Sequence, residues 1–299
     1  MAKNFSANER RILSLFANGL VFNYKGDDYT VNYATKPTCG KGEPKTDIFI
    51  STIKNTNNQE VCFKISYKQN NADFLENKTN AERAELLLGK DWAKLIQKST
   101  ENIKGKFESR YLIYKSKHGK TEAGAITLGW KFELLRVLSG ELSGEMILTH
   151  EQKVDVYAGT NLPKEKREAL VNGTPISNSG IAEYIFEETT SVSTAQDVID
   201  SMLTIEEFLV KYPKIYFACK ALNYRSFVKK FDGDRPLSVY VDWNVVNDKL
   251  NPELKYNAPL TTKGNSVCKK LLKSLEELGI KDANGVVLTN IVDMSKVHE

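Results

Sequence analysis

The chain has 299 residues, of which 41% are hydrophobic and 27% charged, and its formal net charge is +4. This composition is typical of a globular protein with one large domain or two. No apolar run reaches the roughly 18 residues of a membrane-spanning helix, and the first residues lack the apolar core of a signal peptide. Four widely spaced cysteines without a Cys-x-x-Cys pair argue against a zinc site or a disulfide framework, and indicate a cytoplasmic location.

The positive charge is unevenly distributed along the chain. Residues 1–120 hold 21 Lys and Arg against 13 Asp and Glu, whereas the remaining residues hold 21 against 25. A positive surface suits a polyanionic substrate such as DNA. An ordinary solvated surface rich in lysine explains the same count.

The first elements are a helix and a pair of strands. Ser6-Ala7-Asn8-Glu9 has the pattern of a capping box and predicts a helix through residues 10–17, with apolar residues on one face. Residues 21–33 alternate around a Gly-Asp turn and predict two paired strands.

Two apolar-rich runs then predict a β-hairpin. They cover residues 42–50 and 61–69, and Asn55-Thr56-Asn57-Asn58 forms a polar turn between them. Because paired strands lie about 5 Å apart, Asp47 at the start of one strand can lie beside Lys68 near the end of the other. A carboxylate and an ammonium group at one sheet edge can hold a divalent cation and position a water that attacks phosphate.

A second helix follows the hairpin. Thr79 is its predicted N-cap, and Gly89 is expected to end it. Glu82 occupies the capping-box position three residues after Thr79. It is therefore either a capping residue or an acid that faces a functional site.

The residues Pro44, Asp47 and Lys68 resemble the motif of the PD-(D/E)xK nuclease superfamily, best known from type II restriction endonucleases. That family carries an Asp after a Pro, then an acid, a spacer and a Lys on the neighbouring strand. Here Ser66 stands at the position of the acid. Some restriction endonucleases with a Ser-x-Lys motif take the missing carboxylate from the following helix, and Glu82 follows Lys68 after 13 intervening residues.

The resemblance covers roughly residues 1–120 and implies a mixed α/β (α+β) fold. We expect a restriction-endonuclease-like core with a central mixed sheet flanked by helices in residues 1–120. An α/β region in residues 121–299 would serve DNA recognition or dimerisation, because cutting both strands of a symmetric site usually requires two active sites.

The resemblance also implies the site residues. Asp47 and Glu82 would bind Mg²⁺, Lys68 would orient or deprotonate the attacking water, and Ser66 would contribute a hydrogen bond but no charge. In the superfamily an early helix sometimes adds a further acid, a role open to Glu9 beside its simpler capping role.

Basic and aromatic residues outside the motif are candidates for DNA contact. The expected contacts are Lys45, Lys117, Lys120, Tyr224, Arg225, Lys229 and Lys230. A solvated turn at residues 115–120 and a half-buried strand at residues 224–231 are the alternatives. Residues 183–207 hold seven acids and no Lys or Arg, so this stretch should face away from DNA or meet a basic partner. The three histidines have no zinc-ligand spacing, so a histidine metal site is not expected.

The sequence therefore predicts a Mg²⁺-dependent endonuclease, of the type II restriction kind, that acts on double-stranded DNA as a homodimer. A catalytically inactive DNA- or partner-binding protein with the nuclease fold is the alternative, and Ser66 is its main support. A chance match of the short motif is the third interpretation.

Overall fold

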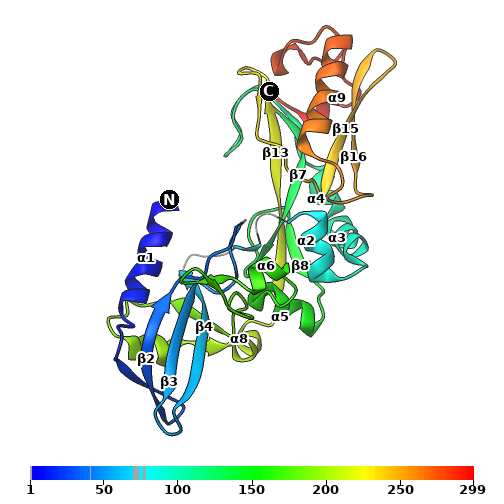
Figure 1. The fold of residues 1–299 in the computed structure, drawn as a ribbon. Coiled ribbons are helices and arrows are strands. Elements are labelled where there is room, and N and C mark those ends of the chain that lie inside the picture. Colours follow the sequence, from blue (N-terminus) through cyan, green and yellow to red (C-terminus); the bar gives the residue numbers. More distant parts are fainter. Residues whose placement is uncertain (1, 41, 70–73, 77–78) are drawn as a thin grey trace. The chain divides into compact units, whose positions relative to one another are not determined.

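The computed structural model describes residues 2–40, 42–69, 74–76 and 79–299, which divide into two compact units (Figure 1). The first unit comprises Met1–Leu75 and Leu148–Lys214, and the second comprises Glu76–Ile147 and Ile215–Glu299. Each unit is thus assembled from two separate stretches of chain. Residue 120, the boundary expected from the sequence, lies inside the second unit.

The first unit is built on a mixed sheet with helices, as the mixed α+β expectation requires. Its strand order is β1-β2-β3-β4-β11-β12, and β11 runs parallel to β4 while the other neighbours are antiparallel. The strands are β1 (Val21–Tyr24), β2 (Asp27–Thr35), β3 (Ile48–Lys54), β4 (Gln59–Gln69), β9 (Leu170–Val171), β10 (Thr174–Pro175), β11 (Tyr184–Glu188) and β12 (Leu203–Thr204). The helices are α1 (Ala2–Ser14), α5 (His150–Ala158), α6 (Lys164–Arg167), α7 (Ala195–Ser201) and α8 (Ile205–Lys211).

The predicted hairpin is confirmed as β3 and β4. Their antiparallel register runs from Ile48 opposite Ile65 to Lys54 opposite Gln59. Asn58 takes a positive φ of 56° in the turn, a conformation that asparagine tolerates better than most residues. The predicted strand pair of residues 21–33 is likewise present as β1 and β2.

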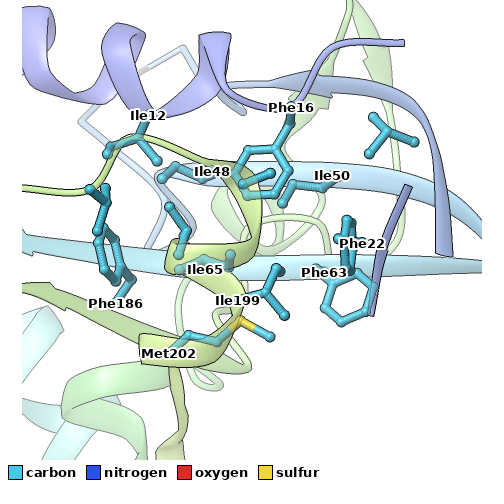
Figure 2. Packing of buried hydrophobic residues seen from close by; sticks show 14 of the residues in the cluster. Ile12, Phe16, Phe22, Ile48, Ile50, Phe63, Ile65, Phe186, Ile199 and Met202 are labelled. Atoms are coloured by element: carbon cyan, nitrogen blue, oxygen red, sulfur yellow. The ribbon is translucent and has the colours of Figure 1, made fainter. Parts of the chain in front are cut away.

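One face of this sheet is covered by apolar side chains that fix the strand orientation (Figure 2). Ile12 of α1 and Phe16, two residues beyond its end, belong to the same buried cluster as Ile48, Ile50 and Ile65. Because side chains alternate along a strand, burying these residues directs Asp47 and Ser66 to the opposite face. Each fully buried side chain of this size contributes about 1.5–3 kcal/mol, so the register is strongly fixed.

Two predicted helix starts are wrong. Helix α1 begins at Ala2, so Ser6 lies within the helix and does not cap it. Helix α2 (Ala81–Leu88) is capped by Asn80, whose side chain accepts a hydrogen bond from the Arg83 backbone N at 2.8 Å. Thr79 is buried instead. Since Asn80 is the cap, the third helical residue is Arg83, and Glu82 has no capping-box role. The predicted end at Gly89 is confirmed.

The second unit holds a larger sheet whose path is β14-β13-β7-β15-β16. Its strands are β6 (Ile113–Tyr114), β7 (Ala125–Leu135), β8 (Ser143–Met146), β13 (Ile215–Arg225), β14 (Lys230–Phe231), β15 (Val239–Val246), β16 (Lys249–Lys255) and β17 (Val297–His298). Its helices are α2, α3 (Trp92–Glu101), α4 (Lys104–Glu108) and α9 (Gly264–Glu277), with short 3₁₀ turns at Ala283–Gly285 and Met294–Lys296. The short strand β5 (Phe74–Glu76) lies where the chain passes between the units.

Helix α9, orange in Figure 1, is fixed on this sheet through Trp243. The Trp243 side chain is fully buried and donates its indole N–H to the Thr127 carbonyl at 3.1 Å. Ser274 of α9 donates its hydroxyl to the Trp243 carbonyl at 3.1 Å. The buried polar groups are thereby paired, and they tie β7, β15 and α9 together.

The charge balance of the two units differs from that of the two domains predicted from the sequence. The first unit contains 16 Lys and Arg against 18 Asp and Glu, and the second contains 26 against 20. The excess positive charge therefore belongs to the second unit. All four cysteines are free thiols. In the described part of the chain, no helix is long and apolar enough to cross a membrane.

Candidate active site

Asp47 is held at the start of β3 by the neighbouring strand. Its backbone N donates to the Ile65 carbonyl at 3.0 Å. Its carboxylate Oδ2 accepts hydrogen bonds from the Tyr67 backbone N at 2.8 Å and from the Ser66 hydroxyl at 3.3 Å. Ser66 is 1% exposed, so its hydroxyl orients Asp47 and does not face solvent. The sequence predicted that Asp47 lies beside Lys68; the hydrogen bonds of its carboxylate are to Ser66 and Tyr67 of the same strand, and Lys68 acts on Asp47 through its charge.

The charged groups around Asp47 determine its protonation. The carboxyl group is closely surrounded by protein, although the residue keeps some exposure, and this burial raises the pKa of Asp47. The positive charge of Lys68 is the largest influence that lowers this pKa, followed by the Tyr67 N–H, while Glu9 raises it and Lys36 lowers it. The ionised carboxylate therefore depends on nearby positive charge.

Glu9 lies in the charged surroundings of Asp47 and forms an ion pair there. Lys36 Nζ lies 2.6 Å from Glu9 Oε2 and 3.9 Å from Glu43 Oε1. Because α1 begins well before Glu9, the capping explanation for this residue is removed. Lys36 was not predicted, since it follows a strand without any motif that would distinguish it from other lysines.

The segment just before Asp47 is held in place by hydrogen bonds to the Gly180 carbonyl. The backbone N–H groups of Lys45 and Thr46 both donate to the Gly180 carbonyl, at 3.0 and 3.2 Å. A Cβ atom on Gly180 would lie 1.8 Å from the Lys166 carbonyl oxygen, so only glycine allows this approach. Gly180 is thus a positioning residue that no local pattern in the sequence indicated.

Part of the acidic stretch of residues 183–207 is used inside the first unit. Glu188 accepts hydrogen bonds from the Tyr67 hydroxyl and from Arg11 of α1. Glu183 pairs with Lys64 at 2.7 Å. These acids therefore link α1 and β4 to β11, a structural role that the prediction of an outward-facing or partner-binding stretch did not include.

Glu82 belongs to the second unit. It is exposed near the start of α2 and lines a pocket of about 320 Å³. The other charged residues of the pocket are Lys131, Asp234, Arg235 and Lys263. Asp47, Ser66 and Lys68 belong to the first unit. The predicted catalytic residues thus come from both units.

The predicted DNA contacts differ in accessibility. Lys117, Lys120, Lys229 and Lys230 are exposed. Arg225 forms ion pairs with Asp232 at 2.9 Å and Glu122 at 3.1 Å. Lys45 donates to the Leu75 carbonyl at 3.1 Å. Tyr224 is 6% exposed, so the prediction that it stacks on bases is wrong: β13 turns its ring into the core.

Within residues 2–40, 42–69, 74–76 and 79–299, no group of three or more His, Cys, Asp or Glu side chains is placed to hold a metal. Mg²⁺ usually needs only one or two carboxylates, and keeps several waters.

The chain matches no protein-family model, no curated protein and no solved structure. The basis for assigning a function is therefore the arrangement of side chains at the site.

Proposed function

We propose that this protein is a Mg²⁺-dependent endonuclease that cuts double-stranded DNA, with a restriction-endonuclease-like core in its first unit. The observation that carries the proposal is the Asp47 carboxylate. It is held by the Tyr67 N–H and the Ser66 hydroxyl on the neighbouring strand, with the charge of Lys68 in reach. A buried acid with a displaced pKa beside a specific charge partner is a common feature of active sites.

The residues near Asp47 fit Mg²⁺. Both hydrogen bonds described for this carboxylate end on Oδ2, which leaves Oδ1 as the atom that would hold the cation. The raised pKa of Asp47 reflects burial that positive charge offsets, so a bound cation would favour the ionised form. When bound, Mg²⁺ would polarise the phosphate and increase the acidity of a water.

Each remaining residue then has a defined task. The Tyr67 N–H and the Ser66 hydroxyl orient the Asp47 carboxylate. The Lys68 ammonium group orients the attacking water and stabilises the negative charge that develops on the phosphate. Ser66 supplies no charge, so a second carboxylate completes the site.

Two residues are candidates for this second carboxylate. Glu82 is the one that the Ser-x-Lys resemblance implies, and this resemblance alone supports it, because Glu82 belongs to the second unit and Asp47 to the first. Glu9 is supported by a different observation, because its charge already influences the pKa of Asp47 within the first unit. If Glu9 is the ligand, Lys36 must release it, since their 2.6 Å ion pair occupies the carboxylate.

The net positive charge of the second unit supports a DNA-binding role for that unit. The exposed lysines Lys117, Lys120, Lys229 and Lys230 would neutralise phosphates. We further propose a homodimer for cleavage of both strands and a cytoplasmic location, in keeping with four free thiols.

The decisive experiment is a cleavage assay on mixed plasmid DNA with and without Mg²⁺. Asp47→Asn and Lys68→Ala should each reduce single-turnover cleavage by about 100-fold or more, because the first removes a charged ligand and the second the group that orients the water. Glu82→Gln and Glu9→Gln identify the second acid. Glu85→Gln is the matched control for Glu82, since it is exposed on the same helix.

Normal cleavage by Asp47→Asn would refute the proposal. The alternative function, an inactive protein that binds DNA or another partner, is favoured by Ser66 at the position of the family acid. It predicts that the wild-type protein binds DNA in a salt-dependent manner and cuts no plasmid under any metal condition.

A further inference from the structure

Two of the three histidines of this protein meet in the second unit. The ring centroids of His118 and His298 are 4.5 Å apart, and the ring planes are inclined by 60°. The two residues are distant in the sequence, which is why no zinc-ligand spacing indicated them. The fold, and not a local motif, forms the pair.

The backbones of both histidines are fixed by hydrogen bonds. His298 ends β17, which pairs in parallel with β6, and its carbonyl accepts a hydrogen bond from the Lys115 N at 2.8 Å. His118 and Thr121 exchange two backbone hydrogen bonds of 3.0 and 2.9 Å across a tight turn. Because the backbone at both histidines is already ordered, ligand binding does not have to pay the entropy cost of ordering it.

Two tyrosines pack around the histidine pair. The Tyr111 ring centroid lies 5.1 Å from that of His298, and the Tyr114 ring centroid lies 6.3 Å from that of His118. Tyr114 donates its hydroxyl to the Tyr111 carbonyl at 2.9 Å, which holds this aromatic wall together. His118 is exposed and His298 is half-buried, so the imidazoles remain accessible from solvent.

The separation of the rings fits chelation of one ion. With metal–nitrogen bonds of about 2.1 Å, the ring centroids of two imidazoles on one ion lie about 4.6 Å apart at a coordination angle of 90° and about 5.3 Å apart at the tetrahedral angle. The observed 4.5 Å is close to the first of these distances, which belongs to a six-coordinate ion with water ligands, and a small rotation of the rings would reach the second. Neutral imidazole binds Zn²⁺, Cu²⁺ and Ni²⁺ well, whereas Mg²⁺ prefers oxygen ligands.

We propose that His118 and His298 form a binding site for a borderline divalent transition-metal ion, represented by Zn²⁺. In the described part of the chain no third His, Cys, Asp or Glu completes a ligand group, so water fills the other positions. Lys117 and Lys120 are exposed on the same loop, and Lys115 is paired with Glu299 at 2.9 Å. The positive charges of these lysines lower the affinity of the site for every cation. Only metal ions that bind imidazole strongly should therefore bind there.

Zinc binding to the full-length chain without a histidine tag tests the proposal. Isothermal titration at about pH 7.5, with excess Mg²⁺ to occupy oxygen sites, should give one Zn²⁺ per chain, and His118→Ala and His298→Ala should each weaken binding by about tenfold or more. His150→Ala is the matched control, because its ring contacts Glu206 at 3.0 Å in the first unit. Its affinity should equal that of the wild type.

The pH dependence and the histidine NMR signals give independent readouts. Zinc binding should weaken on acidification, because protons compete with the metal for the imidazole nitrogens. Of the three histidine side-chain resonances, Zn²⁺ should shift those of His118 and His298 and leave that of His150 in place. This readout uses the wild-type fold, and it stays valid if a variant is unstable.

Three results would overturn the proposal: no zinc binding by the wild type, unchanged affinity in both His118→Ala and His298→Ala, or loss of binding in a chain with Cys39 and Cys62 replaced by Ser. The last result would assign the zinc to thiolates. The proposal does not depend on the nuclease activity, because zinc binding is measured without DNA.

Discussion

Replacing Asp47 by Asn should stabilise the folded protein while it abolishes cleavage. The burial that raises the pKa of Asp47 also means that the ionised carboxylate destabilises the fold at neutral pH. An asparagine keeps an oxygen that accepts the Tyr67 N–H and removes the buried charge. A single stabilising substitution of this kind commonly raises the free energy of unfolding by about 0.5–2 kcal/mol. For a unit of this size, that corresponds to a rise in melting temperature of about 2–6 °C.

The pH dependence of this effect has a definite sign. Because the folded-state pKa of Asp47 lies above its ordinary value of 3.8, the folded protein binds this proton more tightly than the unfolded chain. Wild-type stability should therefore be undiminished below that value, and fall as the pH rises through the folded-state pKa. The advantage of Asp47→Asn should be absent in acid and largest at neutral pH.

Thermal melting of both proteins between about pH 3 and pH 8 checks this prediction, with Asp28→Asn as the control for an exposed carboxylate. If Asp47→Asn melts below the wild type at neutral pH, the carboxylate stabilises the fold as an ordinary ion pair with Lys68. The argument that this acid is retained for chemistry would then be wrong.

The other predictions concern the positioning of the site and its substrate. Gly180→Ala should lower the free energy of unfolding by about 2–4 kcal/mol in urea titrations, because its Cβ would meet the Lys166 carbonyl at 1.8 Å, whereas Gly40→Ala, with open space around it, should change little. Asn80→Ala should lower this free energy by about 1 kcal/mol through loss of the α2 cap. The isosteric Thr79→Val, which removes only the buried hydroxyl of Thr79, should not, an order that melting curves reverse if Thr79 is the cap. DNA affinity should fall linearly with salt on logarithmic axes, and a flat response in titrations would exclude phosphate contacts.

The hairpin that carries Asp47 was predictable because its determinants are local. Alternating apolar residues give β3 and β4 a buried face, and the Asn55–Asn58 turn joins them directly. Once this register is fixed, Asp47 and Ser66 must be neighbours. The contacts of Gly180 with residues 44–46 were not predictable, because they join segments separated by more than a hundred residues and leave no local pattern.

The two wrong helix starts have different physical causes. Residues that can cap a helix often occur next to each other, as Thr79 and Asn80 do, and the sequence does not say which of them takes the extended conformation. In the fold Thr79 is buried, so its neighbour Asn80 caps the helix. For Ser6 the helix extends further toward the N-terminus than the local pattern indicated.

The domain division was missed for a related reason. The second unit is formed by two stretches of chain that lie before and after residues 148–214. Where the chain passes from one unit to the other, neither its composition nor its hydrophobic periodicity changes, so the sequence does not mark the boundary. Counting charges along the sequence therefore placed the excess of Lys and Arg in residues 1–120. The three-dimensional division assigns them to a unit other than the one that holds Asp47.

The direction of the pKa displacement separates Asp47 from carboxylates with structural roles. The pKa of Asp27 is lowered mainly by its hydrogen bond to Lys54, and the pKa of Asp197 is lowered mainly by the Ser193 backbone N–H. Such acids gain stability from their partners. At Asp47 burial outweighs the hydrogen bond from Tyr67 and the charge of Lys68, so the ionised acid lacks full compensation within the described residues. A cation would supply that compensation, and this links the energetics of Asp47 to metal binding.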